Sequence, residues 1–262
     1  TRFIAKPKPS SPATTLSLSA SVKPHERGET PMFAVIFEVQ PKKDRGDDYL
    51  DLAKYLKPKL EAIDGFIDNE RFESKRARGR VLSLSTWRDE KAVVRWRTAR
   101  EHHGVQEKGR FEIFEDYHLR VGEVTEDSDP PRGLAVVQQR FDETANPVAK
   151  AVSITELSPP EGNKPKIAAE HLGVQIGLGN NPDGLVDYEI FESIYNAGKL
   201  LLLITWRDAE AARRWAPVAR PDFGKLRHRR VRIIRDYGMT DRNEAPQFYP
   251  EVRGRAHGVA AE

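Results

Sequence analysis

The stretch RFESKRARGRVLSLSTWRDEKAVVRW at Arg71–Trp96 recurs 119 residues later as IFESIYNAGKLLLLITWRDAEAARRW at Ile190–Trp215. Both copies contain Phe-Glu-Ser followed by Thr-Trp-Arg-Asp, and both end on a tryptophan. The same offset aligns two dipeptides outside the stretch, Asp64-Gly65 with Asp183-Gly184 and, after one inserted residue, Asp116-Tyr117 with Asp236-Tyr237. A match that keeps its register over this length indicates an internal duplication.

Each copy shows the same succession of hydrophobic periodicities. In the first copy we predict a strand at 33–40 and then a helix from Tyr49 to Ile63, with Asp47 or Asp48 as its cap and Asp64-Gly65 at its end. Strands follow at 66–74 and 80–87. A helix capped by Asp89 and a strand from Phe111 to Val121 complete the copy. In the second copy we predict strands at 150–157, 185–193, 199–206 and 230–237, with helices near 165–178 and from Asp208.

This order is β-α-β-β-α-β, the ferredoxin-like pattern of an α+β protein. Such a sheet carries helices on one face and needs a partner for the other. Two copies can cover each other, so we predict two ferredoxin-like repeats that form an intrachain dimeric α+β barrel, an internal pseudo-dimer that a second chain could join. The expected segments are a flexible tail at 1–31, domains at 32–123 and 150–238, a linker at 124–149 with an extra strand at 134–141, and a tail at 239–262.

The composition excludes several classes of protein. The chain has 43 basic and 40 acidic residues, so its net charge of +3 gives no indication of a nucleic-acid partner. The absence of cysteine excludes disulfides and thiolate catalysis. The longest apolar run, Leu200–Ile204, is far below the roughly 20 residues that span a bilayer. We therefore expect a soluble, cytoplasmic protein without a membrane partner, although the acid-poor, serine-rich leader also permits a transit peptide.

Three segments of the chain resemble the antibiotic biosynthesis monooxygenase family of dimeric α+β barrels. They are MFAVIFEV, SLSTWRDEKAVVRWRTAREHHGVQEKGR and FEIFEDYHLRV, and the resemblance covers 32–123 well and 150–238 more weakly. It implies a range of activities that includes oxidation of anthrone-like or quinol substrates by O2 without metal or organic cofactor, degradation of haem, and no catalysis at all. We expect a cofactor-independent monooxygenase acting on an aromatic, anthrone- or quinol-type substrate with O2. The alternatives are a non-catalytic ligand-binding or structural barrel, and a haem-binding or haem-degrading protein.

The haem alternative can be compared with the family pattern residue by residue. The haem-degrading branch places an iron-ligating histidine ten residues after the second tryptophan, and this chain has Gln106 there. The asparagine of that branch's first strand falls near Phe37 or Glu38, and neither is an amide. Both differences argue against haem degradation.

Oxygenation without a cofactor requires a proton acceptor, a positive charge for a developing anion and an apolar pocket. The expected catalytic residues are His103, Gln106 and Arg110, and the expected substrate-binding residues are Trp96, His102, Phe114 and Tyr117. His103 shares a face with Trp96 and Ala99 if the second helix continues. Each residue also has a structural interpretation, namely core packing for Trp96, a helix-end position for His103, fixing of the next loop for Gln106 and Arg110, and a role between the halves for Tyr117.

The histidines and one basic run are the other candidate binding features of the chain. The histidines show no spacing typical of a metal site, so no metal is expected. The basic run Lys225–Arg230 is interpreted as a solvated face, with an anionic ligand as the alternative.

Overall fold

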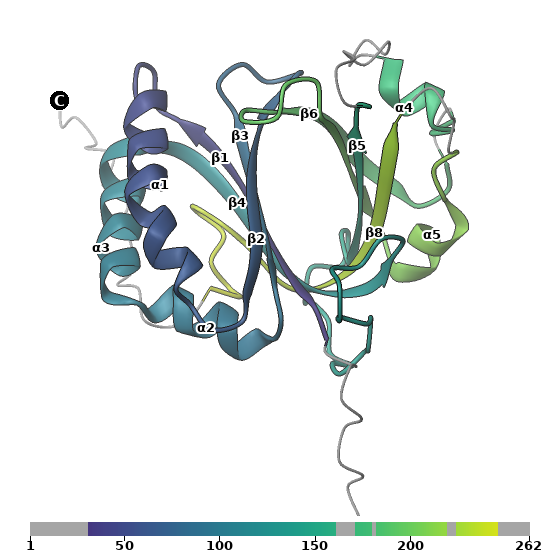
Figure 1. Ribbon diagram of the computed structural model, residues 1–262, viewed down its shortest axis with the longest axis horizontal. Coiled ribbons are helices and arrows are strands. Elements are labelled where there is room, and N and C mark those ends of the chain that lie inside the picture. Colours follow the sequence, from purple (N-terminus) through teal and green to yellow (C-terminus); the bar gives the residue numbers. More distant parts are fainter. Residues whose placement is uncertain (1–30, 161–170, 180–181, 219–223, 246–262) are drawn as a thin grey trace, which may run out of the picture.

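The computed structural model describes residues 31–160, 171–179, 182–218 and 224–245. These residues form one closed antiparallel barrel with the strand order β1-β3-β2-β6-β7-β5-β8-β4 (Figure 1). The first copy supplies β1 (Phe33–Pro41), β2 (Phe66–Ser74), β3 (Val81–Trp87) and β4 (Phe114–Asp127). The second supplies β5 (Ala151–Ser158), β6 (Leu185–Ser193), β7 (Leu200–Trp206) and β8 (Lys225–Gly238). The predicted α+β barrel of two ferredoxin-like repeats is confirmed.

The helices lie outside the barrel on two opposite sides (Figure 1). The first copy contributes α1 (Gly46–Glu61), α2 (Glu90–Thr98), α3 (Arg100–Lys108) and one π-helical segment, η1 (Gly109–Ile113). The second contributes α4 (Leu172–Gln175) and α5 (Ala209–Arg214). As predicted, Asp89 caps α2 by accepting from the Ala92 amide at 2.7 Å, and Asp208, where the second helix was expected to begin, caps α5 by accepting from the Ala211 amide at 2.8 Å. No helix in the described ranges is long and apolar enough to cross a membrane.

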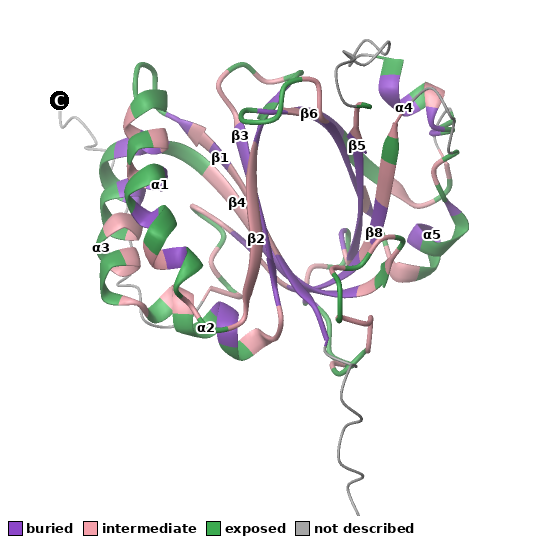
Figure 2. Ribbon diagram, viewed as in Figure 1, coloured by how far each residue is buried: buried purple, intermediate pink, exposed green. Residues whose placement is uncertain are grey.

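Two seams join the halves. The short seam pairs β2 with β6 over Phe72↔Ser193 to Ser74↔Phe191, and the long seam pairs β4 with β8 from His118↔Gly238 to Asp127↔Arg229. Gly122 lies in the long seam, where a Cβ atom would come within 2.5 Å of the Arg232 carbonyl oxygen. Inside the barrel, alternate residues of the strands form one apolar core that includes Ile36, Phe72, Ile154 and Phe191 (buried strands in Figure 2).

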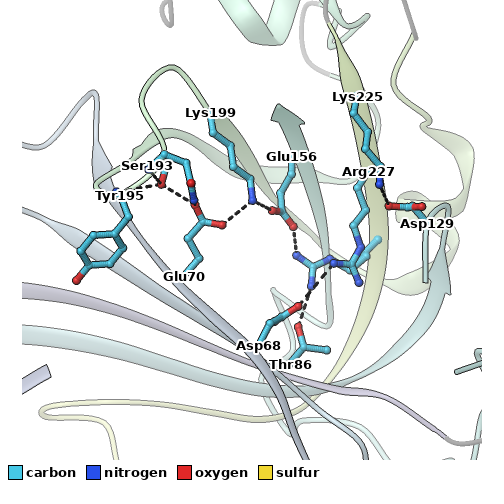
Figure 3. Close-up of polar contacts among 12 residues, drawn as sticks. Asp68, Glu70, Thr86, Asp129, Glu156, Ser193, Tyr195, Lys199, Lys225 and Arg227 are labelled. Carbon is cyan, nitrogen blue, oxygen red and sulfur yellow. Dashed lines mark hydrogen bonds and ion pairs between the residues drawn. The ribbon is translucent and has the colours of Figure 1, made fainter. Parts of the chain in front are cut away.

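Buried charges cross the interior in a nearly symmetric arrangement. Arg120 pairs with Glu38 and donates to Thr205 Oγ1 of the other half at 2.9 Å. Arg229 pairs with Glu156 and donates to Thr86 Oγ1 of the other half at 3.1 Å. Figure 3 shows the second of these groups, which continues from Glu156 through Lys199 to Glu70. The polar groups thus fix the register of one half against the other.

This symmetry corrects the alignment of the last strands. Ile36 pairs with Arg120 and Ile154 pairs with Arg229, so Arg229 is the counterpart of Arg120. By the same register Leu226 is the counterpart of Tyr117, because Val39↔Tyr117 corresponds to Leu157↔Leu226. The predicted correspondence of Asp116-Tyr117 with Asp236-Tyr237 is therefore wrong.

Some predicted elements differ from the structure. Residues 134–141 form no strand; this segment is held by Glu123, whose carboxylate accepts from the Gln139 and Arg140 amides at 2.5 and 3.1 Å. The helix α1 has no side-chain cap, and Asp47 and Asp48 lie within its first turn. The last strand of the first copy begins at Phe114 because η1 occupies the preceding residues. The helix expected near 165–178 lies partly outside the described residues, which contain only α4 there.

The basic run Lys225–Arg230 is not a solvated face. It forms the beginning of β8, where its cations pair with carboxylates: Lys225 with Asp129, Arg227 with Asp127, Arg229 with Glu156 and Arg230 with Glu126. His228 is buried, and its Nδ1 lies 2.9 Å from Thr155 Oγ1. The positive charge of this run is therefore neutralised by ion pairs with acidic residues of the barrel.

Candidate active site

A cavity of about 200 Å³ lies between the helices of the first copy and the outer face of their sheet. Its apolar wall on the helix side comes from α1, where Leu52, Leu56 and Leu60 recur at helical spacing. Its opposite wall comes from outward-facing strand residues such as Val35 and Leu119. The cavity therefore occupies space that the sequence pattern would otherwise assign to a packed core.

A break between α2 and α3 decides which histidine reaches this cavity. The second helix ends at Thr98, Ala99 adopts an extended conformation, and a new helix begins at Arg100. His102 then turns back, so that its ring stacks on Trp96 with centroids 4.1 Å apart and its Nδ1 lies 3.0 Å from the Trp96 carbonyl oxygen. The expected placement of His103 beside Trp96 required a continuous helix and is wrong. His103 does not line the cavity, and its Nε2 lies 3.6 Å from Glu107 at the surface.

His102 is neutral at physiological pH. Burial lowers the pKa of this imidazole to about 4, although the hydrogen bond to the Trp96 carbonyl opposes the shift. A carbonyl oxygen can only accept, so Nδ1 must carry the proton and Nε2 is left as an acceptor. Gln106 Nε2 lies 3.3 and 3.4 Å from the two ring nitrogens. The site therefore offers a fixed neutral acceptor rather than a strong base.

His102, Gln106 and Arg110 are spaced four residues apart and all line the cavity. Arg110 is only 5% exposed and donates to the Met239 carbonyl oxygen at 3.5 Å. Before it, Gly109 leaves room for the Phe114 ring, which a Cβ atom would approach to 2.6 Å. The structure thus brings together six of the seven residues expected from the sequence, namely Trp96, His102, Gln106, Arg110, Phe114 and Tyr117.

Other residues of the cavity were not anticipated. Asn69 and Arg71 lie on the outer face of β2 at alternate positions, so the strand periodicity could have indicated them. Burial raises the pKa of Tyr49, which keeps this lining phenol protonated beside Arg71. Three more lining residues come from β8 and the residues after it, Arg235, Tyr237 and Arg242. Nothing in their local sequence could have indicated them, because the closure of the barrel brings them here.

The cavity is electropositive. Among the described residues, five arginines line it, Arg71, Arg97, Arg110, Arg235 and Arg242, against one carboxylate, Glu90, which is paired with Arg140. A low-dielectric wall strengthens the field of such charges inside a cavity. The arrangement favours a small ligand with an apolar body and a negative charge.

The second copy has a different interior. Its described residues between helices and sheet pack into a core around Trp206 and Trp215, whose ring centroids are 6.1 Å apart. Trp215 also contacts the ring of His228 at 5.5 Å. The first shared tryptophan thus packs in a core in both copies, as Trp87 and Trp206, whereas the second lines the cavity as Trp96 and packs in the core as Trp215. No group of three or more potential metal ligands occurs among the residues that the structure describes.

The chain was compared with known proteins. The family model for antibiotic biosynthesis monooxygenase matches residues 32–108. The jasmonate monooxygenase ABM of Pyricularia oryzae is 43% identical over 223 residues, which cover 84% of this chain and 99% of the relative. The uncharacterized protein YqjZ of Bacillus subtilis is 34% identical over 97 residues, which cover 37% of this chain and 82% of that protein.

Among solved structures, aldoxime dehydratase OxdRE in complex with butyraldoxime matches with a TM-score of 0.50 and 11% identity. The match covers 78% of this chain and 80% of that chain. Similarity at this level of identity shows a shared fold alone.

Proposed function

Because this chain belongs to the antibiotic biosynthesis monooxygenase family, we propose that it is a monooxygenase whose substrate binds in the cavity of the first copy. We further propose that the substrate is a small carboxylate of the jasmonate class. The observation that carries this proposal is the excess of arginine in an otherwise apolar cavity of about 200 Å³. The near full-length similarity to a jasmonate monooxygenase supports the same substrate class.

The lining residues divide into three roles under this proposal. The arginines hold the carboxylate, since a guanidinium remains charged and can bond both carboxylate oxygens. Trp96, Phe114 and Tyr117 contact the apolar body of the substrate. His102 presents Nε2 at the reacting end, where the Gln106 amide nitrogen lies 3.4 Å away, so a donor group of the substrate would replace Gln106 as its partner. With a pKa of about 4, this imidazole is a weak general base near neutral pH. We therefore assign His102 the roles of orienting the substrate and stabilising charge in the transition state.

An aromatic quinol or anthrone is the second candidate substrate, supported by the aromatic wall and by the stacked Trp96–His102 pair. Such a substrate supplies all the electrons that reduce O2. Hydroxylation of a saturated carbon instead needs two external electrons, so that one oxygen atom enters the product and the other leaves as water. We do not propose haem, because Gln106 occupies the position of the iron-ligating histidine of the haem-degrading branch. For a jasmonate we propose a soluble two-electron reductant of the ascorbate class as co-substrate, and for either substrate we propose no bound metal or organic cofactor.

The proposal is tested by measuring oxygen consumption with jasmonate, in the presence and absence of ascorbate, and with a panel of hydroquinones and anthrones. Mass spectrometry with labelled O2 should show one added oxygen atom in the product. His102→Phe should reduce turnover, whereas His103→Gln is the matched control and should retain wild-type activity, because His103 lies outside the cavity. Binding of jasmonate without oxygen consumption under any condition would instead favour a non-catalytic ligand-binding barrel.

A further inference from the structure

Equivalent charged residues lie at the two ends of the barrel interior. The offset of 119 residues relates Glu70 to Glu189 and Arg80 to Lys199. Glu70 and Lys199 lie together at one end, here called the Lys199 end, which Figure 3 shows. Glu189 and Arg80 lie together at the other, here called the Arg80 end. The duplication thus allows the two ends to be compared residue by residue.

The sheet register adds two further equivalent pairs. Glu38 lies opposite His118 in the pairing of β1 with β4, and Glu156 lies opposite Arg227 in the pairing of β5 with β8. Glu38 at the Arg80 end is therefore the equivalent of Glu156 at the Lys199 end. In the same way, His118 takes the place of Arg227.

At the Lys199 end an ammonium group lies between two carboxylates. Lys199 Nζ is 2.5 Å from Glu70 Oε2 and 2.6 Å from Glu156 Oε2 (Figure 3). The other carboxylate oxygen of Glu156 pairs with Arg229. The protein itself thus shows that this arrangement of two glutamates binds a primary ammonium.

At the Arg80 end the equivalent carboxylates bind only guanidiniums among the described residues. Arg80 Nη1 lies 3.2 Å from Glu189 Oε2, and Arg76 Nη2 lies 3.6 Å from the same atom. Glu38 Oε2 pairs with Arg120 at 2.5 Å, and its Oε1 has no hydrogen-bond partner in the described part of the chain. No side chain in these ranges bridges the two glutamates as an ammonium does at the other end.

A cavity of about 780 Å³ occupies the Arg80 end, and both glutamates line it. This volume is large enough for a small organic molecule. Carboxylates outnumber basic side chains in the described lining, where the basic residues are Arg80, Arg120 and His118. His118 Nε2 lies 2.6 Å from Asp236, and its Nδ1 lies 3.8 Å from Glu38 Oε2, beyond hydrogen-bond distance. The cavity therefore favours a cationic ligand.

We propose that this cavity binds the primary ammonium group of a small organic molecule. The ammonium lies between Glu38 and Glu189, as the Lys199 ammonium lies between Glu156 and Glu70. This site is additional to the proposed monooxygenase site and does not depend on it, since neither Glu38 nor Glu189 lines the first-copy cavity.

The chemistry of the cavity favours an amine over a metal ion. An ammonium has three N–H donors, and its hydrogen bonds to carboxylates are charge-assisted. The side chains of Val148, Val186 and Leu203 also line the cavity and can contact an alkyl stem. In contrast, the described residues contain no group of three or more potential metal ligands.

The experiment measures binding to the full chain by isothermal titration. The probes are n-butylammonium, n-butanol as the same stem without charge, and Ca²⁺. The variants are Glu38→Gln and Arg80→Lys, with Glu210→Gln as the matched control because Glu210 is exposed on α5 and bonds Arg213 at 2.6 Å. Circular dichroism establishes that each variant is folded.

Wild type should bind one equivalent of n-butylammonium with a dissociation constant of about 1 mM or lower, and should bind n-butanol at least about tenfold more weakly. Glu38→Gln should weaken binding of the amine about tenfold or more. Arg80→Lys should do the same, because its own ammonium takes the position that Lys199 takes at the other end. Glu210→Gln should bind within about twofold of wild type. Should Glu38→Gln not fold, Arg80→Lys carries the comparison.

The Lys199 end supplies an independent test. Lys199→Ala removes the ammonium between Glu70 and Glu156, so n-butylammonium should occupy a second site in this variant. The amine should then raise the thermal midpoint of Lys199→Ala by more than it raises that of wild type. An equal rise in both proteins would show that such a pair of glutamates does not select an ammonium, which overturns the proposal.

Other results would also overturn the proposal. They are equal affinity for n-butylammonium and n-butanol, an equal loss of affinity in Glu38→Gln and Glu210→Gln, unchanged binding by Arg80→Lys, and no binding by wild type. Displacement of the amine by a lower concentration of Ca²⁺ would assign the cavity to a metal ion instead. All of these results leave the proposed monooxygenase activity untouched, whereas binding of the amine without turnover of any proposed substrate overturns only that activity.

Discussion

Two histidines, the partly buried His102 and the buried His228, should make the protein less stable as the pH falls from about 6.5 towards about 4. Burial lowers the pKa of His102 and of His228 to about 4 in the folded protein, whereas an unfolded histidine titrates near 6.5. In this pH range the unfolded chain binds protons that the folded protein does not bind, so a falling pH favours unfolding. Above pH 7 both states are neutral at these positions, and the contribution is nearly constant.

The structure explains why the protonated form of His228 is disfavoured. Its Nδ1 lies 2.9 Å from Thr155 Oγ1, and Nε2 is buried without a hydrogen-bond partner among the described residues. Arg230 and Arg229 also lower its pKa, although Asp127 opposes them. From pKa values of about 6.5 and about 4, each histidine should reduce the free energy of unfolding by about 2 kcal/mol between pH 7 and pH 5.

Urea unfolding at both pH values, followed by tryptophan fluorescence, measures this effect. Carboxylates contribute their own pH dependence, so the informative quantity is the difference between wild type and the variants His228→Leu and His102→Phe. In each variant the loss of stability between pH 7 and pH 5 should shrink by about 2 kcal/mol. A wild-type pH dependence in both variants would refute the reasoning, because it would mean that neither imidazole is held neutral by folding.

Two further predictions concern the contacts between the halves. Glu156→Gln leaves the buried guanidinium of Arg229 without its carboxylate. This change should lower the free energy of unfolding, measured with urea, by about 3 kcal/mol. A decrease below about 1 kcal/mol would show that the pair is not desolvated. Gly122→Ala places a Cβ atom within 2.5 Å of the Arg232 carbonyl oxygen and should destabilise the long seam by about 2 kcal/mol. Calorimetry checks the second change, and an unaltered thermal midpoint would contradict the packing described for β4 and β8.

The elements of the fold could be predicted from the sequence where local patterns determine them. Alternating residues in strands, helical spacing in α1, and the aspartate caps at Asp89 and Asp208 all depend on neighbours in the chain. The correspondence of β4 with β8 could not be predicted in the same way. Two Asp-Tyr dipeptides recur at a similar offset by coincidence, while the sheet register makes Arg229 the counterpart of Arg120.

The candidate site also contains some residues that local sequence patterns predict and others that only the closed barrel brings together. Its helical residues were identified from the family-like segment, but the choice between His102 and His103 depended on one extended residue, Ala99, which neither glycine nor proline marks. Arg71 follows the strand period and could have been anticipated. Arg242 could not, because a residue more than a hundred positions from α3 reaches the cavity only after both seams have closed.

Both seams of the barrel lie within a single polypeptide, and this has a consequence for how the protein behaves on dilution. A barrel assembled from two separate chains falls apart as the protein concentration drops, and any pocket with walls from both chains is lost with it. Here closure is intramolecular, so the pocket should persist at any protein concentration. Separate subunits encoded by one gene must also carry identical pockets. Fusion removes that constraint, because each half can acquire substitutions that its twin does not share.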